Sequence, residues 1–465
     1  MIDMLICAMP WIDTDRPILA PAVLKAVVRQ AGFTVRTHDL NQQVNDMLVQ
    51  HAQSSSITRF FQQQFIEDSA NECIADMIQQ SVDTVLSYQP RVVALSLLAQ
   101  DCQYFTWWFC YHLKYISPNT KIIIGGSGIK NFIAQNDISY AEELRSRGLI
   151  DDYIFGDGEV AIVEYLKGNL DYPGINQHHW QQIDNLNCMP FADFDDYDLA
   201  SYGSRGIPIC DSRGCVRTCE FCDVIEHWKK YKYRTAENIF AEMVYQIARH
   251  GLTRFHFYNS LTNGNMKEFS RLLDFICNYN TNHANAPISW DGYFIIRSSA
   301  QHPEALWQKL SASGAELMLG VESVVEHVRK GLGKNFSNAD IDYHLDMAQK
   351  YQVPLQLLLI VGYPTETRED FEYTKQWFRD RKHFARMPIK NVQCSLSAIL
   401  PGTQLEQNQH KYGIVRGELP IFWMNTHSQI TEKDRADYHR SLQSILNEMH
   451  ISSSDESLQM GVING

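Results

Sequence analysis

The chain has 465 residues, about three times the length of a typical domain, so we expect two or three domains. Hydrophobic residues make up 45% of the sequence and charged residues 20%, which is ordinary globular composition. The formal net charge of −13 argues against a broad basic surface for binding nucleic acid, although it is compatible with a local basic patch.

The sequence has no sign of membrane insertion or export. No apolar run reaches the ~18 residues that a membrane helix needs. The N-terminus lacks a basic segment followed by an apolar core and a cleavage site. We therefore expect a cytoplasmic protein that makes no membrane contact, in which the 11 cysteines do not form a disulfide framework.

The first third of the chain alternates between strand and helix patterns. Residues 2–9 form an apolar run typical of a buried parallel strand, and 21–32 begin with Pro21 and end with Gly32, as helices often do. The remaining elements are strands at 33–38, 91–97, 121–126 and 152–156, helices within 41–88 and a helix at 104–115. This alternation predicts an α/β, Rossmann-like doubly wound sheet in a domain spanning 1–160.

Ligands of such sheets lie at the carboxyl ends of the strands. The glycine-rich segment 125–128 ends one of these strands and has two interpretations, a phosphate cradle or a tight turn. It fits neither the dinucleotide-binding fingerprint at a first strand nor the P-loop, so we favour the turn.

A weaker pattern follows, and we interpret residues 161–205 as a linker rich in turn residues. It contains His178 and His179, which are potential metal ligands. Adjacent histidines point in different directions and no third ligand is near in sequence, so we predict no metal there.

Three cysteines, Cys215, Cys219 and Cys222, follow in the spacing CxxxCxxC. Soft thiolates select zinc, copper(I) or iron-sulfur clusters. A closed zinc site needs four ligands, and the chain offers no matching pair downstream, only Cys210 nearby. A 4Fe-4S cluster held by three thiolates keeps one iron open to another ligand, which indicates chemistry at the cluster.

With the aromatic Phe221 before its last cysteine, this loop resembles the signature of the radical S-adenosylmethionine (SAM) superfamily. The resemblance implies that Cys215, Cys219 and Cys222 hold a 4Fe-4S cluster whose fourth iron is chelated by SAM. Reductive cleavage then yields methionine and a 5′-deoxyadenosyl radical, which abstracts a hydrogen atom from the substrate. Phe221 would neighbour the adenine, and Cys210, which matches no ligand position, would be a packing residue.

The chain behind the loop repeats strands separated by helical stretches. The strand patterns lie at 252–258, 288–297, 315–323, 355–364 and 391–402. They resemble the family's partial (β/α)6 barrel, which we place at 206–402, followed by a short and mainly helical C-terminal extension at 403–465.

The resemblance assigns cofactor contacts at the ends of these strands. Glu322 of the GVES segment would place the ribose or amino group of SAM, Arg297 the methionine carboxylate, and Gly362 and Pro364 the adenine. Asn259 stands where many relatives carry an acidic residue, so its contact with the amino group stays open. Glu322 could instead favour a helix N-terminus, and Arg297 could be a surface ion-pair partner.

A Rossmann-like domain placed before the cysteine loop resembles the cobalamin-binding class of the superfamily. The segments 21–41, 125–126 and 155–159 carry this resemblance. Cobalamin in that class lies between the two domains and often carries a methyl group. A DxHxxG motif is absent, as in many relatives, and the bulky segment 102–109 either fills the corrin space or is the core face of a helix, which we favour.

Three functions remain open, and no catalytic side chain is assigned for any of them. The first is a cobalamin-dependent radical SAM methyltransferase acting on an unactivated carbon. The second is a cobalamin-independent radical isomerase, oxidase or rearrangement enzyme that uses the front domain as a scaffold. The third is a non-enzymatic iron-sulfur protein, which explains the cysteines but not the strand ends. Either enzyme would need an electron donor such as flavodoxin or ferredoxin, and a small-molecule, peptide or nucleotide-type substrate.

Overall fold

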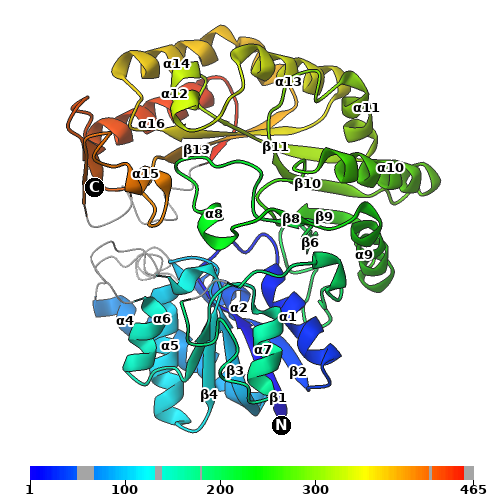
Figure 1. Ribbon diagram of the computed structural model, residues 1–465, viewed down its shortest axis with the longest axis vertical. Helices are drawn as coiled ribbons and strands as arrows, with labels where there is room; N and C mark the ends of the chain where they lie inside the picture. The colour runs from blue at the N-terminus through cyan, green and yellow to red at the C-terminus, as the bar shows by residue number, and fades with distance from the viewer. Residues whose placement is uncertain (50–67, 131–138, 179–180, 418–420, 455–465) are drawn as a thin grey trace. The chain divides into compact units, whose positions relative to one another are not determined.

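The structure is a computed structural model that describes residues 1–49, 68–130, 139–178, 181–417 and 421–454. These residues form two compact units, Met1–Pro208 and a second unit that begins at Ile209 (Figure 1). Within the described ranges, no helix has the length and apolar character needed to cross a bilayer.

The first unit is built on a five-stranded sheet in the order β2-β1-β3-β4-β5, with all neighbouring strands parallel. Its strands are β1 Ile2–Ala8, β2 Val35–Asp39, β3 Pro90–Ser96, β4 Lys121–Gly125 and β5 Asp152–Ile154. Its helical elements are α1 Leu19–Gln30, α2 Leu40–Val49, α4 Asp68–Ser87, α5 Cys102–Ile116, η1 Ser127–Ile129, α6 Tyr140–Ser146, α7 Gly158–Leu166 and η2 Leu186–Cys188. The strand order is one of the two common doubly wound orders, so the predicted Rossmann-like sheet is confirmed.

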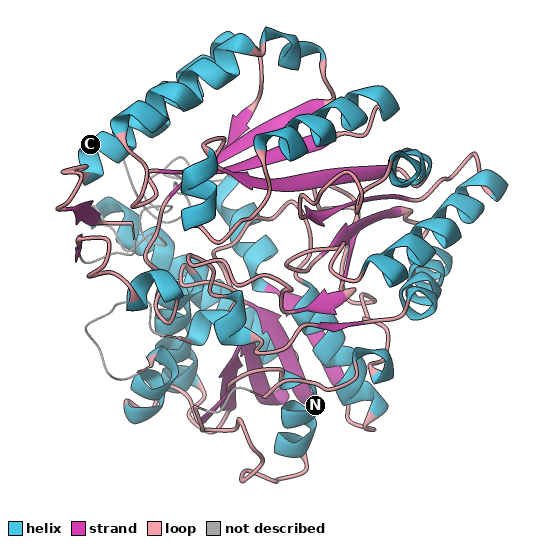
Figure 2. Ribbon diagram, turned by 45° about the horizontal axis from the view of Figure 1, so that its top comes forward, coloured by secondary structure: helices cyan, strands magenta, loops and turns pink. Residues whose placement is uncertain are grey.

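Both faces of this sheet are buried, which explains why its strands are apolar without alternation. In β1, Leu5 and Cys7 join the core cluster that contains α2, α4, α5 and α6, whereas Met4 and Ile6 join the cluster that contains α1 and α7. Figure 2 shows helices on the two sides of the strands.

The bulky segment 102–109 forms the first half of α5. Phe105 and Phe109 are at most 1% exposed and belong to the core cluster. The segment is therefore the core face of a helix, as we favoured from its sequence.

The glycine-rich segment 125–128 is a tight turn held against the end of the neighbouring strand. Gly126 has a φ of +101°, and a Cβ there would lie 2.2 Å from the carbonyl oxygen of Leu97. A Cβ at Gly128 would lie 2.4 Å from the carbonyl oxygen of Ala99. These glycines allow the close approach of two backbones, which accounts for their presence without a phosphate.

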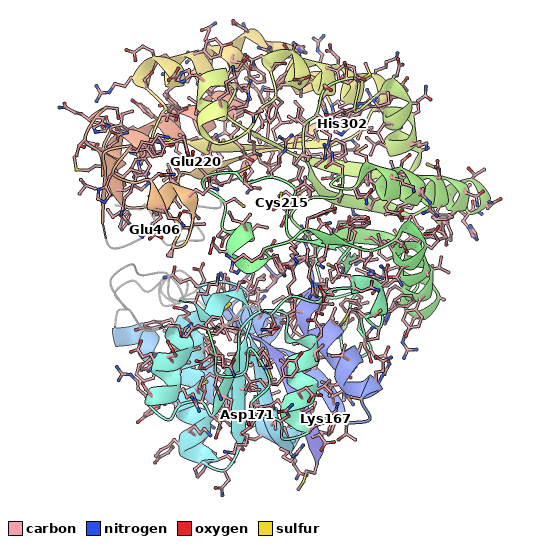
Figure 3. All side chains as sticks on the ribbon, in the orientation of Figure 1. Lys167, Asp171, Cys215, Glu220, His302 and Glu406 are labelled. Carbon is pink, nitrogen blue, oxygen red and sulfur yellow. The ribbon has the colours of Figure 1, made fainter. Side chains whose placement is uncertain are left out.

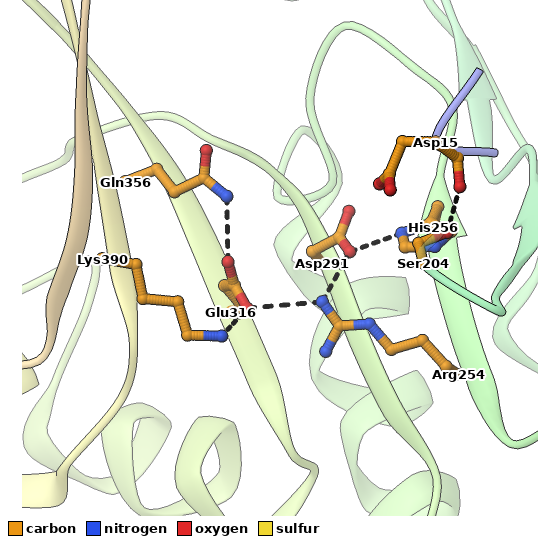
Figure 4. A network of polar contacts seen from close by, with 8 residues as sticks. All are labelled: Asp15, Ser204, Arg254, His256, Asp291, Glu316, Gln356 and Lys390. Atoms are coloured by element: carbon orange, nitrogen blue, oxygen red, sulfur yellow. Dashed lines mark hydrogen bonds and ion pairs between the residues drawn. The ribbon is translucent and has the colours of Figure 1, made fainter. Parts of the chain in front are cut away.

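The segment expected to be a linker packs onto the first unit and belongs to it. Asp193 and Asp196 lie 3.1 Å and 2.7 Å from the ammonium of Lys25 on α1, and all three side chains are at most 7% exposed. Asp196 also accepts the backbone N–H of Thr37. Farther along, Ser204 donates backbone and side-chain hydrogen bonds to the carbonyl oxygen of Asp15 (Figure 4).

Replacing Asp196 with alanine should therefore destabilise the protein by about 3 kcal/mol, because it removes one partner of a buried ion pair. We expect the thermal midpoint to fall by ~8 °C. The control is Lys167→Ala, because Lys167 is 54% exposed and its pairing with Glu164 lies at the surface. Equal midpoints for the two variants would show that the contacts of Asp196 do not hold the segment in place.

The second unit is built on a seven-stranded sheet in the order β16-β13-β12-β11-β10-β9-β6. Its strands are β6 Ile207–Ile209, within which the boundary between the two units falls, β9 Arg254–Phe257, β10 Ser289–Phe294, β11 Ala315–Glu322, β12 Leu355–Val361, β13 Ile389–Leu396 and β16 Ser453–Ser454. Its helical elements are α8 Val224–His227, α9 Ala236–His250, α10 Met266–Asn282, α11 Glu304–Ala312, α12 Glu326–Gly331, α13 Asn338–Tyr351, α14 Arg368–Asp380, η3 Lys382–Arg386, α15 Gln404–Gln407 and α16 Glu432–Glu448. From β6 to β13 the order in space follows the order in the chain, as in (β/α) barrels, and the predicted six-strand partial barrel is confirmed.

Short elements complete this unit. The two-stranded sheets are β7 Ser212–Arg213 with β8 Lys232–Tyr233, and β14 Ile414–Arg416 with β15 Trp423–Asn425. The C-terminal extension supplies α15, β14, β15 and α16, and its β16 pairs in parallel with β13. The extension is thus joined to the edge of the main sheet.

A polar network ties together the beginnings of the barrel strands (Figure 4). Glu316 on β11 accepts hydrogen bonds from Lys390 on β13 at 2.5 Å and from Gln356 on β12 at 2.9 Å. Arg254 on β9 donates to both Glu316 and Asp291. Burial raises the pKa of Glu316, but these bonds and cationic neighbours outweigh it, so the pKa is lowered overall. This end of a barrel commonly serves stability.

The ionised form of Glu316 should stabilise the fold at neutral pH. Glu316→Gln should lower the thermal midpoint at pH 7 by an amount equivalent to about 2 kcal/mol. Because the folded-state pKa is lowered, this stabilisation is present above the unfolded pKa of ~4.3 and disappears as the pH falls through the folded pKa. The midpoints of wild type and variant, measured from pH 7 to acid, should converge. A constant gap would contradict a contribution from the charge.

Candidate functional site

The three clustered cysteines lie on an irregular loop between β7 and α8, in the barrel unit (Figure 3). Cys219 is buried, and Cys215 and Cys222 are half-buried. A turn closes the loop where the N–H of Cys222 donates to the carbonyl oxygen of Cys219 over 3.1 Å. The loop begins at Gly214, where a Cβ would lie 2.8 Å from the carbonyl oxygen of Lys230.

The thiols are close enough to influence one another's ionisation. Burial raises the pKa of Cys222 to about 12, and the charges of Cys219 and Cys215 act in the same direction. Burial also raises the pKa of Cys219, and the charge of Lys334 opposes it. Thiols in such a setting bind as thiolates once iron supplies positive charge.

The three thiols of the loop suit an iron-sulfur cluster. No three Cys, His, Asp or Glu side chains in the described ranges are placed to hold one metal ion together. Cluster ligands need no common centre, because each thiolate binds a different iron. Cys210 is engaged elsewhere, since its thiol donates to the carbonyl oxygen of Ser212 over 3.2 Å.

Glu322 ends β11 and faces a lysine. Its φ is +59°, a conformation that non-glycine residues adopt mainly where the surroundings enforce it. The ammonium of Lys334 lies 2.5 Å from its carboxylate and donates to the carbonyl oxygen of Gly320 over 3.1 Å. Burial opposes the charge of Lys334, but Glu322 and the two nearby thiols outweigh it and raise its pKa. Glu322 is therefore a buried ion-pair partner and does not act as a helix cap.

Arg297 follows β10 and lies near the cysteine loop. It donates to the carbonyl oxygen of Asn263 over 3.2 Å, and its Nε is buried without a hydrogen-bond partner among the described residues. Burial and then the positive charge of Arg217, a residue of the cysteine loop, lower the pKa of Arg297. Two neighbouring guanidinium groups suit an anionic ligand such as a carboxylate.

Asn259, which follows β9, contacts an acidic residue from another strand end. Its amide nitrogen donates to the carboxylate of Asp211, which follows β6. Burial raises the pKa of Asp211 to about 7. The acidic group that the sequence lacks after β9 is thus present beside Asn259, supplied from β6.

Gly362 and Pro364 form a loop after β12 that other elements hold in place. Gly362 has a φ of +75°, and its N–H donates to Glu366 over 2.6 Å. A Cβ at Gly362 would lie 2.5 Å from the side chain of Arg435 on α16. The carbonyl oxygen of Pro364 accepts from Asn425 over 2.7 Å. Burial raises the pKa of Glu366 to about 8.

Sequence reasoning missed two residues of this site, Lys334 and Asp211. Lys334 lies 12 residues beyond Glu322 along the chain, and only the turn at Gly333 brings it back to the cysteine loop. A Cβ at Gly333 would lie 3.4 Å from the Cα of Cys219. A lysine after a glycine-rich turn was the available signal, and for Asp211 the signal was an acidic residue just ahead of the loop. Phe221 is half-buried on the loop itself.

Of the two adjacent histidines in the first unit, the structure describes His178. His178 lies 2.5 Å from the carboxylate of Glu142 and packs against the ring of Phe155. His179 lies outside the described residues.

Comparison with known families and proteins supports the interpretation of the barrel unit. The model of the radical SAM superfamily matches residues 209–378. An uncharacterized methyltransferase of Pyrococcus horikoshii is 21% identical over 343 residues, which are 69% of this chain and 70% of that protein. Cytidylyl-2-hydroxyethylphosphonate methyltransferase of Streptomyces wedmorensis is 23% identical over 66% of this chain and 62% of its own length.

Two solved structures share the fold over nearly the whole chain. The radical SAM methyltransferase TsrM from Kitasatospora setae, with cobalamin and a 4Fe-4S cluster bound, has a TM-score of 0.62 at 16% identity, covering 95% of this chain and 85% of that one. The cobalamin-dependent SAM radical enzyme OxsB has a TM-score of 0.62 at 13% identity, covering 97% and 62%. At these identities the likeness concerns the fold. The match over residues 209–378 shows that this chain carries a radical SAM domain, which follows a Rossmann-like unit.

Proposed function

We propose that this protein is a cobalamin-dependent radical SAM methyltransferase. The observation that carries the radical SAM part is the loop of Cys215, Cys219 and Cys222, set in the matched barrel with the Lys334–Glu322 pair acting on two of its thiols. The three thiolates would hold the 4Fe-4S cluster. When bound, the cluster supplies the electron that cleaves SAM to methionine and a 5′-deoxyadenosyl radical.

The same strand ends would bind SAM beside the cluster. Arg297, with its unpaired Nε and its neighbour Arg217, would hold the methionine carboxylate. Glu322, fixed by Lys334, would take the ribose or amino group. Asn259 would act with Asp211, whose buried carboxyl offers the acidic contact for an amino group.

The adenine of SAM would lie against two other parts of the unit. Phe221 is half-buried on the cysteine loop and offers an aromatic face. The loop of Gly362 and Pro364 is held rigidly by Glu366 and Asn425, as a binding surface requires.

The Rossmann-like unit supports the cobalamin part of the proposal. Its strand order is one in which ligands bind at the carboxyl ends of the strands. The rings of Phe105 and Phe109 pack into the core of the unit. TsrM and OxsB carry cobalamin, and the relatives from Pyrococcus and Streptomyces are methyltransferases. Bound cobalamin would supply a transferable methyl group, and the target would be an unactivated carbon.

Retention of a corrin tests the methyltransferase. The full chain is purified anaerobically, incubated with hydroxocobalamin and desalted. We expect the corrin absorbance to stay with the protein, and labelled SAM to deliver its methyl group to cobalamin. Cleavage of SAM to 5′-deoxyadenosine without corrin retention would instead support a cobalamin-independent isomerase, oxidase or rearrangement enzyme.

The proposed chemistry requires an electron donor and a substrate. The cluster would take its electron from a low-potential donor such as flavodoxin or ferredoxin in the cytoplasm. The substrate would be a small molecule, a peptide or a nucleotide-type compound.

A further inference from the structure

The cysteine loop contains a carboxylate that the cofactor contacts above do not use. Glu220, between Cys219 and Phe221, is half-buried and points to two tyrosines (Figure 3 labels Glu220). The hydroxyl of Tyr412 donates to its Oε2 over 2.6 Å, and the hydroxyl of Tyr363 approaches the same oxygen at 3.4 Å. Tyr412 belongs to the C-terminal extension, and Tyr363 to the loop after β12.

The backbone of Glu220 is held as well. Its carbonyl oxygen accepts the N–H of Leu405, a fully buried residue of α15, over 2.8 Å. Its N–H donates to the carbonyl oxygen of Leu332 over 3.2 Å. The N–H, the carbonyl oxygen and Oε2 of Glu220 therefore all form hydrogen bonds with residues more than 100 positions away in the chain.

The segment of the C-terminal extension that carries Tyr412 is itself held in place by contacts of its own. Glu406 forms an ion pair with Arg416 and accepts the N–H of Gly402 over 2.6 Å. The rings of Tyr412 and Tyr363 meet edge to face, with centroids 6.4 Å apart. A short segment with these internal contacts is a rigid anchor for the loop.

We propose that Glu220 and Tyr412 form a latch through which the C-terminal extension holds the cysteine loop in its cluster-binding conformation, and that Tyr412 is a positioning residue. An irregular loop has no ladder of backbone hydrogen bonds to fix three thiols in the geometry that a cluster requires. The contacts of Glu220, which lies between Cys219 and Cys222, would hold this part of the loop in that geometry. The inference rests on the cluster of the proposed function.

The test measures how tightly the cluster is held. Full-length variants are reconstituted anaerobically with iron and sulfide, and loss of the cluster's visible absorbance is followed after an iron chelator is added. Tyr412→Phe and Glu220→Ala should each lose the cluster ~10-fold faster than wild type, as removal of outer-shell contacts typically does. Glu220→Gln should behave as wild type, because its amide oxygen can accept the phenol proton. The reduced cluster of Tyr412→Phe should also show a second EPR species.

Tyr343→Phe is the matched control, because it removes one phenol hydrogen bond, to the carbonyl oxygen of His302, on another part of the same unit. It should leave cluster loss and the EPR signal unchanged. The double variant E220A/Y412F should lose the cluster no faster than Glu220→Ala, since Glu220→Ala already removes the contact that Tyr412→Phe removes. Additive effects, or wild-type cluster retention in Tyr412→Phe, would overturn the latch. A wild-type protein that takes up no cluster would overturn the proposed function instead.

Discussion

Replacement of Cys219 with alanine should abolish the 4Fe-4S cluster and with it the cleavage of SAM. Cys219 is a buried residue, and the positive charge of Lys334 acts on its thiol. Because loss of outer-shell contacts alone costs metal sites ~10–100-fold, we expect loss of a ligand to reduce 5′-deoxyadenosine formation by more than ~100-fold. Iron and sulfide content and 5′-deoxyadenosine, both determined anaerobically, measure the effect.

Cys210→Ser is the matched control for this variant. Cys210 lies five residues before the loop's first ligand, and its thiol donates to the carbonyl oxygen of Ser212, a bond that a serine hydroxyl can keep. The variant should retain both cluster and activity. If Cys210→Ser lost the cluster, a fourth thiolate would close the iron that SAM needs. If Cys219→Ala still cleaved SAM, the superfamily chemistry would not apply to this loop.

Replacement of Lys334 with methionine should have the second-largest effect. It leaves the buried carboxylate of Glu322 without its cation and removes a positive charge that acts on Cys219 and Cys222. We expect the midpoint potential of the cluster to become more negative, because the reduced cluster loses a stabilising charge. We also expect SAM cleavage to fall by ~10–100-fold.

Potentiometric titration followed by EPR measures the shift in midpoint potential. Two further variants serve as controls. Lys334→Arg keeps the charge and should recover most of the potential. Lys330→Met removes a lysine of α12 that is 63% exposed and pairs at the surface with Glu326, so it should leave the potential unchanged. Equal potentials in Lys334→Met and wild type would contradict an electrostatic role for Lys334.

The elements that local pattern specifies agree with the structure. The helix expected at 21–32 is present as α1, although it begins at Leu19 and places Pro21 in its first turn, where a missing N–H costs nothing. The extension's long helix, α16, begins with a capping box of Thr431 and Asp434. Such signals lie within a few residues of one another, so they can be interpreted without the rest of the chain.

Contacts between distant segments could not be predicted in the same way. The linker expectation for 161–205 rested on its turn residues, but Asp193 and Asp196 have a buried partner in Lys25, more than 160 positions away. Nothing local distinguishes an acidic residue that will meet a buried cation from one that stays in solvent. The same applies to Asp211, which acquires its importance only beside Asn259.

By itself, the sequence predicted an iron-sulfur cluster at Cys215, Cys219 and Cys222, because these three cysteines lie within one loop. It also determined the alternation of strands and helices, because periodicity is a local property. Only the tertiary structure decided what surrounds the loop. Lys334, Asp211 and Tyr412 reach the site from separate segments, and their burial and charge act over distances in space that chain order does not encode.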